Sequence, residues 1–176
     1  GKTAIVEELE RMIINKEVPK ELENKEIIML EMGSLVAGTK YRGEFEERLN
    51  KIIKEVQEDK NIILFIDEIH SMVSAGGAEG AISAGDILKP YLARGNIKVI
   101  GATTIREYHE FLAKDKALDR RFEKIIINEP TKEEMRAILE KLVPSYEKHY
   151  NMSITKDNIE DLLNLSNTYI FQKNNP

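Results

Sequence analysis

Short apolar runs alternate along the chain with longer segments in which apolar residues recur every three or four positions. The runs predict buried strands, and the periodic segments predict amphipathic helices. We expect strands at 25–32, 61–66, 98–104 and 124–127, and helices at 3–14, at 44–59, near 87, between 104 and 121, from 131 onward and at 157–169. Strands and helices that alternate at such short intervals indicate a parallel α/β sheet with crossover helices.

The pattern changes after Pro130, where helical periodicity replaces the alternation. Thr131 to Glu134 form a capping box behind the proline, and capping boxes mark helix starts. One face of the helix that follows carries Met135, Ile138, Leu139 and Leu142. We therefore expect an α/β domain over 1–129 and the start of a small helical subdomain over 130–176.

Composition excludes several classes of protein. With 41% hydrophobic and 32% charged residues, the chain is typical of a soluble globular protein. Its net charge of -5 argues against a nucleic-acid-binding protein that relies on a broad basic surface. No apolar run has the length of a membrane span, and without cysteine there is no disulfide or thiolate metal site. The three histidines, His70, His109 and His149, are too far apart in sequence to define a metal site, and we assign them no role.

Two adjacent carboxylates, Asp67 and Glu68, directly follow an apolar run over 62–66. Five consecutive apolar residues suit a strand buried on both faces of a parallel sheet, so the charged pair is expected where the strand ends. Ligands of α/β proteins bind at that edge. Asp67 can hold Mg²⁺ there, and Glu68 can orient and polarise a water for attack on a phosphate. The alternative is a strand followed by an ordinary polar turn.

The chain begins with Gly1, Lys2 and Thr3, the last three residues of the phosphate-binding pattern G-x-x-x-x-G-K-[ST]. In that pattern the lysine reaches the terminal phosphates of ATP, the threonine binds Mg²⁺, and the helix N-terminus faces the phosphates. An ordinary helix start capped by Thr3 is the alternative, because so short a string arises often by chance. Together with the carboxylate pair, the string indicates nucleotide hydrolysis.

Further candidate residues have two interpretations each. Thr104 follows the third strand, where its hydroxyl can contact a γ-phosphate or the attacking water, or can cap a helix. Arg120 and Arg121 end a helical segment, where the helix dipole favours cations, or they act as arginine fingers on a neighbouring subunit. Tyr41 lies between two cations in a loop that ends at Gly43, where it packs on its own domain or grips a partner.

Taken together, these motifs resemble the first AAA+ ATPase module of the Clp unfoldases and disaggregases, the heat-shock-protein-hundred class. The resemblance covers essentially the whole chain and rests on five segments: LVAGTKYRGEFEERL at 35–49, FIDEIH at 65–70, LKPYLARG at 88–95, GATT at 101–104 and LDRRF at 118–122. It implies an AAA+ P-loop NTPase fold, in which helices flank a parallel sheet, with ATP and Mg²⁺ as ligands.

The resemblance also implies a role for each candidate residue. It places Gly1, Lys2 and Thr3 in the Walker A site, and it makes Asp67 and Glu68 the Walker B pair. It makes Thr104 the sensor-1 residue and makes Arg120 and Arg121 fingers that act in trans. It assigns Lys40, Tyr41, Arg42 and Gly43 to a pore loop, and Ile138 and Leu142 to the wall of the adenine pocket. The pore would be that of a homohexamer, and the loop would grip an unfolded polypeptide.

Within the family, the segments at 36–40 and 75–82 look more like the ClpC type, which feeds a protease, than the ClpB type, a disaggregase. We therefore expect an ATP-driven protein unfoldase that delivers polypeptides to a Clp protease, in a bacterial cytoplasm or a plastid. The acidic net charge disfavours a nucleic-acid-directed AAA+ ATPase. The intact Asp67–Glu68 pair and both arginines disfavour a module that only scaffolds a hexamer.

The family pattern also includes segments outside this sequence. A strand and most of the glycine loop would precede Gly1, and a further helix near the nucleotide would follow Pro176. We expect these segments in a longer parent protein, and we expect the present stretch alone to bind ATP weakly.

Overall fold

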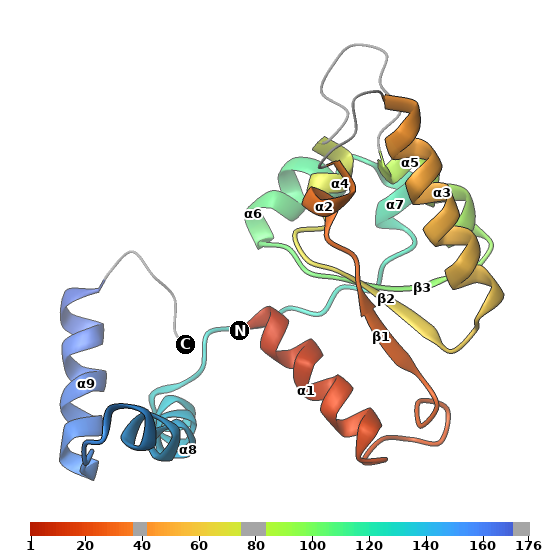
Figure 1. Ribbon diagram of the computed structural model, residues 1–176. Helices are drawn as coiled ribbons and strands as arrows, with labels where there is room; N and C mark the ends of the chain where they lie inside the picture. Colours follow the sequence, from red (N-terminus) through yellow and green to blue (C-terminus); the bar gives the residue numbers. More distant parts are fainter. Residues whose placement is uncertain (37–41, 75–83, 171–176) are drawn as a thin grey trace. The chain divides into compact units, whose positions relative to one another are not determined.

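The computed structural model describes residues 1–36, 42–74 and 84–170, which divide into two compact units (Figure 1). One unit comprises Lys2–Lys124, and the other comprises Ile125–Pro176 together with Gly1. The sheet lies in the first unit, and the described part of the second unit consists of two helices. Among the described residues, no helix is both long enough and apolar enough to cross a membrane.

The sheet consists of parallel strands in the order β1 (Glu26–Met29), β2 (Ile62–Ile66) and β3 (Lys98–Gly101). Leu64 of the central strand lies opposite Ile28 on one side and Val99 on the other. All residues of β2 after the first are buried, as expected for a strand with both faces covered. The predicted parallel α/β sheet is confirmed.

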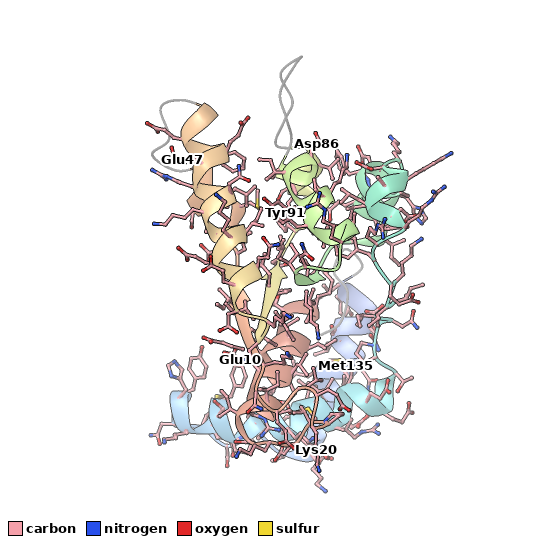
Figure 2. All side chains as sticks on the ribbon, turned by 90° about the vertical axis from the view of Figure 1, so that its right-hand side faces the viewer. Glu10, Lys20, Glu47, Asp86, Tyr91 and Met135 are labelled. Atoms are coloured by element: carbon pink, nitrogen blue, oxygen red, sulfur yellow. The ribbon has the colours of Figure 1, made fainter. Side chains whose placement is uncertain are left out.

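Helices precede, connect and follow the strands, and the connecting ones form the long crossovers that parallel strands need (Figure 1). They are α1 (Lys2–Ile14), α2 (Met32–Val36), α3 (Arg42–Glu58), α4 (Ser71–Ser74), α5 (Ala84–Ala93), α6 (Ile105–Glu107), the π-helix η1 (Tyr108–Leu112) and α7 (Lys116–Asp119). On α5, Asp86 lies in the first turn, and Tyr91 follows it toward the other end of the helix (Figure 2). Short π-helices are rare and often lie at functional sites, which directs attention to η1.

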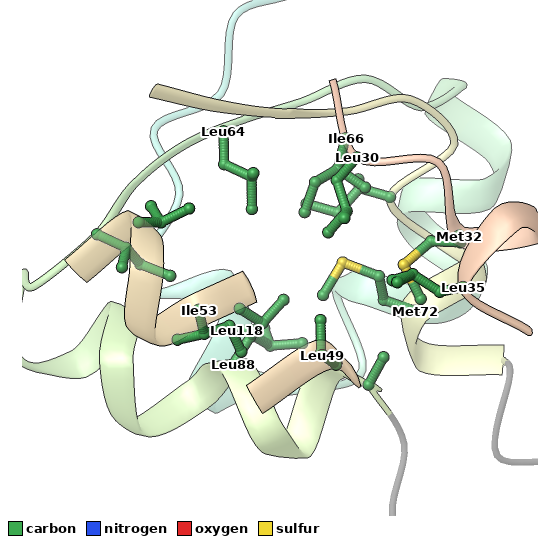
Figure 3. Packing of buried hydrophobic residues seen from close by; sticks show 14 of the residues in the cluster. Leu30, Met32, Leu35, Leu49, Ile53, Leu64, Ile66, Met72, Leu88 and Leu118 are labelled. Atoms are coloured by element: carbon green, nitrogen blue, oxygen red, sulfur yellow. The ribbon is translucent and has the colours of Figure 1, made fainter. Parts of the chain in front are cut away.

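Successive residues of β2 enter two hydrophobic clusters. The larger cluster joins β2 to α3 and α5 (Figure 3), and its most buried members are Leu49, Ile53, Leu64, Ile66 and Leu88. The smaller cluster contains Phe65 of β2, Val6 of α1 and Ala102. Because side chains alternate between the faces of a strand, α1 and the pair α3 and α5 cover opposite faces of the sheet.

Three strand predictions need correction. The strand predicted at 98–104 ends at Gly101, because Thr104 already caps α6. Residues 124–127 are not a strand: Ile125 and Ile126 are 81% and 67% exposed, and in the described chain the sheet ends at β3. An apolar run forms a strand only when a neighbour pairs with its backbone groups, and among the described residues none does. The strand predicted at 25–32 shortens to β1 and is not fully buried, because Met29 lies on an edge strand and is 47% exposed.

The second unit is a pair of helices, α8 (Lys132–Tyr150) and α9 (Lys156–Tyr169), as the sequence pattern predicts. They pack through Met135, Ile159 and Leu163. Thr131 begins α8 with the predicted capping box, and Asn151 ends it with a left-handed φ of 50°.

Candidate functional site

The two residues predicted to hold Mg²⁺ are hydrogen-bonded to each other. Thr3, in the first turn of α1, donates from Oγ1 to Oδ2 of Asp67 at 2.9 Å. Asp67 is the first residue after β2, and α1 packs on this strand through Val6 and Phe65. This packing holds the start of the helix beside the end of the strand, so residues 64 positions apart in the sequence meet there.

Glu68 lies in a strained turn directly after Asp67. Its φ is 51°, in the left-handed region that residues other than glycine rarely adopt. Its N–H donates to Oδ1 of Asp67 at 2.9 Å, and its carbonyl accepts from N of Ser71 at 2.8 Å. Such strain persists only where surrounding bonds hold it, and it is frequent at active sites. The turn leaves Asp67 half-buried and Glu68 exposed to solvent.

Backbone hydrogen bonds join the end of β2 to the end of β3. Ala102 N donates to the carbonyl of Ile66, and Ile69 N donates to the carbonyl of Ala102, both at 3.0 Å. Gly101 permits this close approach, because a Cβ at that position would lie only 2.5 Å from Cδ1 of Ile69. The threonines after β3 are therefore held at the same edge of the sheet as the carboxylate pair.

Thr104 caps a helix, so the structural one of its two interpretations is confirmed. Its Oγ1 accepts from N of Glu107 at 3.2 Å, and Oε2 of Glu107 accepts from N of Thr104 at 3.1 Å. The Thr104 hydroxyl also donates to this oxygen, at 2.7 Å. The hydrogen bond from the Thr104 hydroxyl, and after it the one from the Thr104 backbone N–H, hold the pKa of Glu107 below its ordinary value. The sensor-1 role of Thr104 stays a prediction.

His70, for which no role was predicted, joins the same cluster. Its Nδ1 lies 3.1 Å from Oγ1 of Thr103 and 3.4 Å from Oε2 of Glu107. Its ring stacks on that of Phe111 in η1, with centroids 5.8 Å apart. Spacing along the chain could not reveal this group, because its members follow two different strands. The usable signal is that His70 and Thr103 each lie within four residues of the end of neighbouring strands.

Arg120 and Arg121 directly follow α7, and both are exposed. The structure shows no carboxylate partner for either guanidinium among the described residues. The turn that carries them is anchored by Asp119, which accepts a hydrogen bond from the Tyr108 hydroxyl and pairs with Lys124 at 3.1 Å. The same two partners, Tyr108 first, hold the pKa of Asp119 below its ordinary value.

The roles of the remaining predicted residues are not tested by the structure. Lys40 and Tyr41 lie outside the described residues, while Arg42 and Gly43 begin α3. Lys2 is the first residue of α1 and is exposed, next to Gly1. Ile138 and Leu142 belong to the second unit, where Ile138 packs on the Met135 cluster and Leu142 is 44% exposed. Their roles in the Walker A site, the pore and the adenine pocket stay predictions.

The residues at the strand edge suit a magnesium ion bound together with a nucleotide. In the described chain, no three His, Cys, Asp or Glu residues are close enough together to hold a metal by themselves. Mg²⁺ needs no such cage, because it usually combines one or two protein oxygens with phosphate oxygens and water. The Thr3 hydroxyl and the Asp67 carboxylate are two such oxygens, already in contact.

Comparison with known proteins identifies both parts of the chain. Residues 1–130 match the family described as "ATPase family associated with various cellular activities (AAA)", and residues 131–176 match the AAA lid domain. Among curated relatives, the "Negative regulator of genetic competence ClpC/MecB" of Bacillus subtilis and the "Chaperone protein ClpB" of Oceanobacillus iheyensis are each 54% identical over 170 residues. These alignments cover 97% of this chain and 21% of each relative, so the chain spans about a fifth of their length.

Solved structures agree with the sequence comparison. The chain resembles the S. cerevisiae Hsp104-ADP complex with a TM-score of 0.87 and 42% identity, over 99% of this chain and 30% of that one. It resembles the closed state of Hsp104 with ATPγS and FITC casein with a TM-score of 0.79 and 43% identity, over 97% and 30% of the two chains. The predicted resemblance and the predicted P-loop NTPase fold are confirmed, and the chain belongs to the AAA ATPase family, with an AAA lid domain after residue 130.

Proposed function

We propose that this chain is the ATPase module of a protein unfoldase, which hydrolyses ATP in order to thread polypeptides through the pore of a homohexamer. The observation that carries the proposal is the Thr3–Asp67 hydrogen bond, because it joins the end of the phosphate-binding string to the end of the central strand beside an exposed Glu68. The family and the Clp-type relatives support the same assignment.

Each residue of the site then has a chemical task. Lys2, at the N-terminus of α1, stabilises the terminal phosphates together with the helix dipole. Thr3 and Asp67 would hold Mg²⁺, which would supply positive charge beside the phosphate oxygens. Glu68 accepts a proton from the water whose oxygen attacks the γ-phosphorus, while the bond from that phosphorus to ADP breaks.

Glu68→Gln in the full-length protein tests this assignment. Glutamine keeps the size of the side chain but loses the negative charge that polarises the water. ATP binding should therefore persist, while hydrolysis falls by a factor of about 10² or more. Nucleotide titration and steady-state ATPase assays measure the two quantities, with Glu10→Gln on the exposed face of α1 as the control. Wild-type turnover in Glu68→Gln would remove this glutamate from the mechanism.

We further propose that the unfolded polypeptide is delivered to a Clp protease. The relative in Staphylococcus aureus named "ATP-dependent Clp protease ATP-binding subunit ClpC" is 53% identical to this chain and supports that partner. A disaggregase is the second candidate, because relatives named ClpB are as similar as those named ClpC. The full-length protein should degrade casein when a Clp peptidase is added. Refolding of aggregated protein without any peptidase would favour the second candidate.

A further inference from the structure

One carboxylate oxygen near the candidate site receives polar contacts from both strand ends. Oε2 of Glu107 lies 2.7 Å from the hydroxyl of Thr104 and 3.1 Å from its backbone nitrogen. The same oxygen lies 3.3 Å from Oγ1 of Thr103 and 3.4 Å from Nδ1 of His70. The threonines follow β3 and the histidine follows β2, so Glu107 links the two segments that carry the proposed catalytic residues.

The chemistry of the groups sets the direction of these hydrogen bonds. An ionised carboxylate only accepts, so Thr104 must direct its single hydroxyl proton toward Glu107. Glutamate is ionised at neutral pH in any case, and hydrogen bonding, first from this hydroxyl, lowers the pKa of Glu107 further. The N–H of Glu107 occupies one lone pair of the Thr104 oxygen at 3.2 Å. The other lone pair of the Thr104 oxygen remains free. Toward a water in the nucleotide site, the Thr104 hydroxyl can therefore act only as a hydrogen-bond acceptor.

His70 ties the Glu68 turn to the same carboxylate. With its proton on Nδ1, the imidazole donates to the Thr103 hydroxyl at 3.1 Å and places a positive N–H 3.4 Å from the Glu107 carboxylate. The ring is stacked on Phe111, and only 15% of the His70 side chain is exposed, so its orientation is restricted. His70 is two residues from Glu68, and a change in its contacts with Glu107 and Thr103 would shift the turn that holds the proposed base.

We propose that Glu107, together with His70, is a positioning residue for ATP hydrolysis, which holds the Thr104 hydroxyl as an acceptor for the attacking water. This inference rests on the proposed function. One O–H of the water bonds to Glu68 and the other bonds to Oγ1 of Thr104, so a lone pair of the water is left for the γ-phosphorus. In the reaction the new P–O bond forms, the bond to ADP breaks, and one proton passes to Glu68.

Helix capping alone explains only part of this arrangement. Thr131 and Glu134 form a second capping box, with backbone bonds of 2.8 and 3.2 Å that match those of Thr104 and Glu107. Compared with the Thr131 box, the Glu107 box adds a hydroxyl-to-carboxylate bond, which has a counterpart in the capping box of Thr155 and Asn158, and it adds the contact with His70. Glu134→Gln is therefore a matched control, because it changes a cap of the same kind at the start of α8.

The test compares ATP hydrolysis and ATP affinity in the full-length hexamer. In Glu107→Gln the side chain keeps an oxygen for the cap, but its amide can donate to Thr104 and release the hydroxyl proton from its fixed direction. We expect kcat to fall about 10- to 100-fold, as for other misoriented groups. The ATP dissociation constant and the melting temperature should stay at the wild-type values, and Glu134→Gln should not change kcat.

A double-mutant cycle separates positioning from capping. Thr104→Val removes the hydroxyl but keeps the shape of the side chain, so Glu107→Gln should have no further effect on kcat in that background. His70→Phe keeps a ring stacked on Phe111 but removes Nδ1, and it should lower kcat. Its effect on kcat should not add to that of Thr104→Val in the double variant. Equal losses with and without the hydroxyl would overturn the proposal, and so would wild-type kcat in Glu107→Gln or an effect on ATP affinity alone.

Glu68→Gln, assayed in parallel, distinguishes this failure from failure of the proposed function. If Glu68→Gln hydrolyses ATP at the wild-type rate, the proposed function itself fails. If Glu68→Gln is inactive and Glu107→Gln has wild-type kcat, only the positioning role of Glu107 fails.

Discussion

Lys89 of α5 forms a 2.6 Å ion pair with Asp115, the residue that caps α7. The same ammonium group also pairs with Asp86 at 2.6 Å. Asp115 in turn accepts hydrogen bonds from two backbone N–H groups of α7, at 3.1 and 3.3 Å. The short helix before Arg120 and Arg121 is thus held by a cap that is itself ion-paired.

Asp115→Asn should loosen α7 in a pH-dependent way. Burial would raise the pKa of Asp115, but hydrogen bonds from Lys89 and from the start of α7 outweigh it and lower the pKa. A lowered pKa stabilises the fold above the ordinary value of about 4, and this contribution is lost as the pH falls through the folded-state pKa. Asparagine still caps a helix, so the variant isolates the charge and should destabilise α7 by about 1 kcal/mol at pH 7.

Hydrogen exchange of the α7 amides in the full-length protein measures this change. The difference between Asp115→Asn and wild type should shrink toward zero in acid, because the wild-type carboxylate is then protonated too. Asp115→Ala should show a larger loss at every pH, since it removes the cap as well as the charge. A constant difference for Asp115→Asn from pH 7 down to strong acid would contradict the ion-pair argument.

Gly101→Ala should disturb the site through the packing of Ile69. The added Cβ would lie 2.5 Å from Cδ1, 3.1 Å from Cγ2 and 3.2 Å from Cβ of Ile69. The last two atoms are close to the backbone, so the turn that follows β2 must move with them. We expect a loss of stability of about 1–3 kcal/mol, as for other overpacked cores. We also expect lower kcat, because Glu68 precedes Ile69.

Two companion variants make the Gly101 result specific. Gly33→Ala is the control, because a Cβ at this position of α2 meets no atom within 4 Å. Adding Ile69→Val to Gly101→Ala removes the Cδ1 methyl and should restore part of both stability and kcat. Melting curves and ATPase assays provide the readouts, and a Gly101→Ala protein indistinguishable from Gly33→Ala would rule out the close-approach argument.

The buried strand that ends at Asp67 could be predicted from sequence because its signal is local. Five consecutive apolar residues indicate a strand that is buried on both faces, and the two charged residues directly after them indicate where the buried strand ends. The Thr3–Asp67 contact then follows from two motifs with a known relationship, although they lie 64 positions apart. In both cases, a short stretch of sequence contains the information that is needed.

The errors have the opposite origin. The apolar run at 125–127 reports residues that favour a strand, but the run cannot report whether a neighbouring strand is there to pair with it. The exposure of Met29 likewise depends on the place of β1 at the sheet edge, which is a property of topology. The contact of His70 with Glu107 depends on how the ends of two strands align and on where α6 places Glu107. Spacing along the sequence predicts neither of these.

Tyr41→Ala should separate ATP hydrolysis from threading. Tyr41 lies outside the described residues, and its role in gripping polypeptide is a prediction from the family resemblance. Because no catalytic task falls to it, the full-length variant should keep ATPase activity while unfolding of a tagged substrate is lost. Tyr41→Phe should retain most unfolding, since the aromatic ring supplies the apolar contact. Undiminished unfolding by Tyr41→Ala would count against the pore-loop role.

Arg120 and Arg121 should act on the nucleotide of a neighbouring subunit. Both are exposed, and they follow a turn anchored by Tyr108 and Asp119, as suits side chains presented to a partner. Replacing both by alanine should leave ATP binding intact and lower hydrolysis by about 10³-fold or more. Arg120→Lys and Arg121→Lys together test whether charge alone suffices, because lysine lacks the planar fork of the guanidinium.

Mixing two inactive proteins tests action in trans directly. Subunits with Glu68→Gln keep their arginines, and subunits with both arginines replaced keep Glu68. When the two kinds alternate in one ring, some sites combine an intact Glu68 with intact arginines from the neighbour, so ATPase activity should reappear on mixing. If the arginines served their own subunit, each site would lack one group at every mixing ratio. Activity that stays at the level of the separate variants, in rings shown by labelled subunits to be mixed, would contradict the assignment.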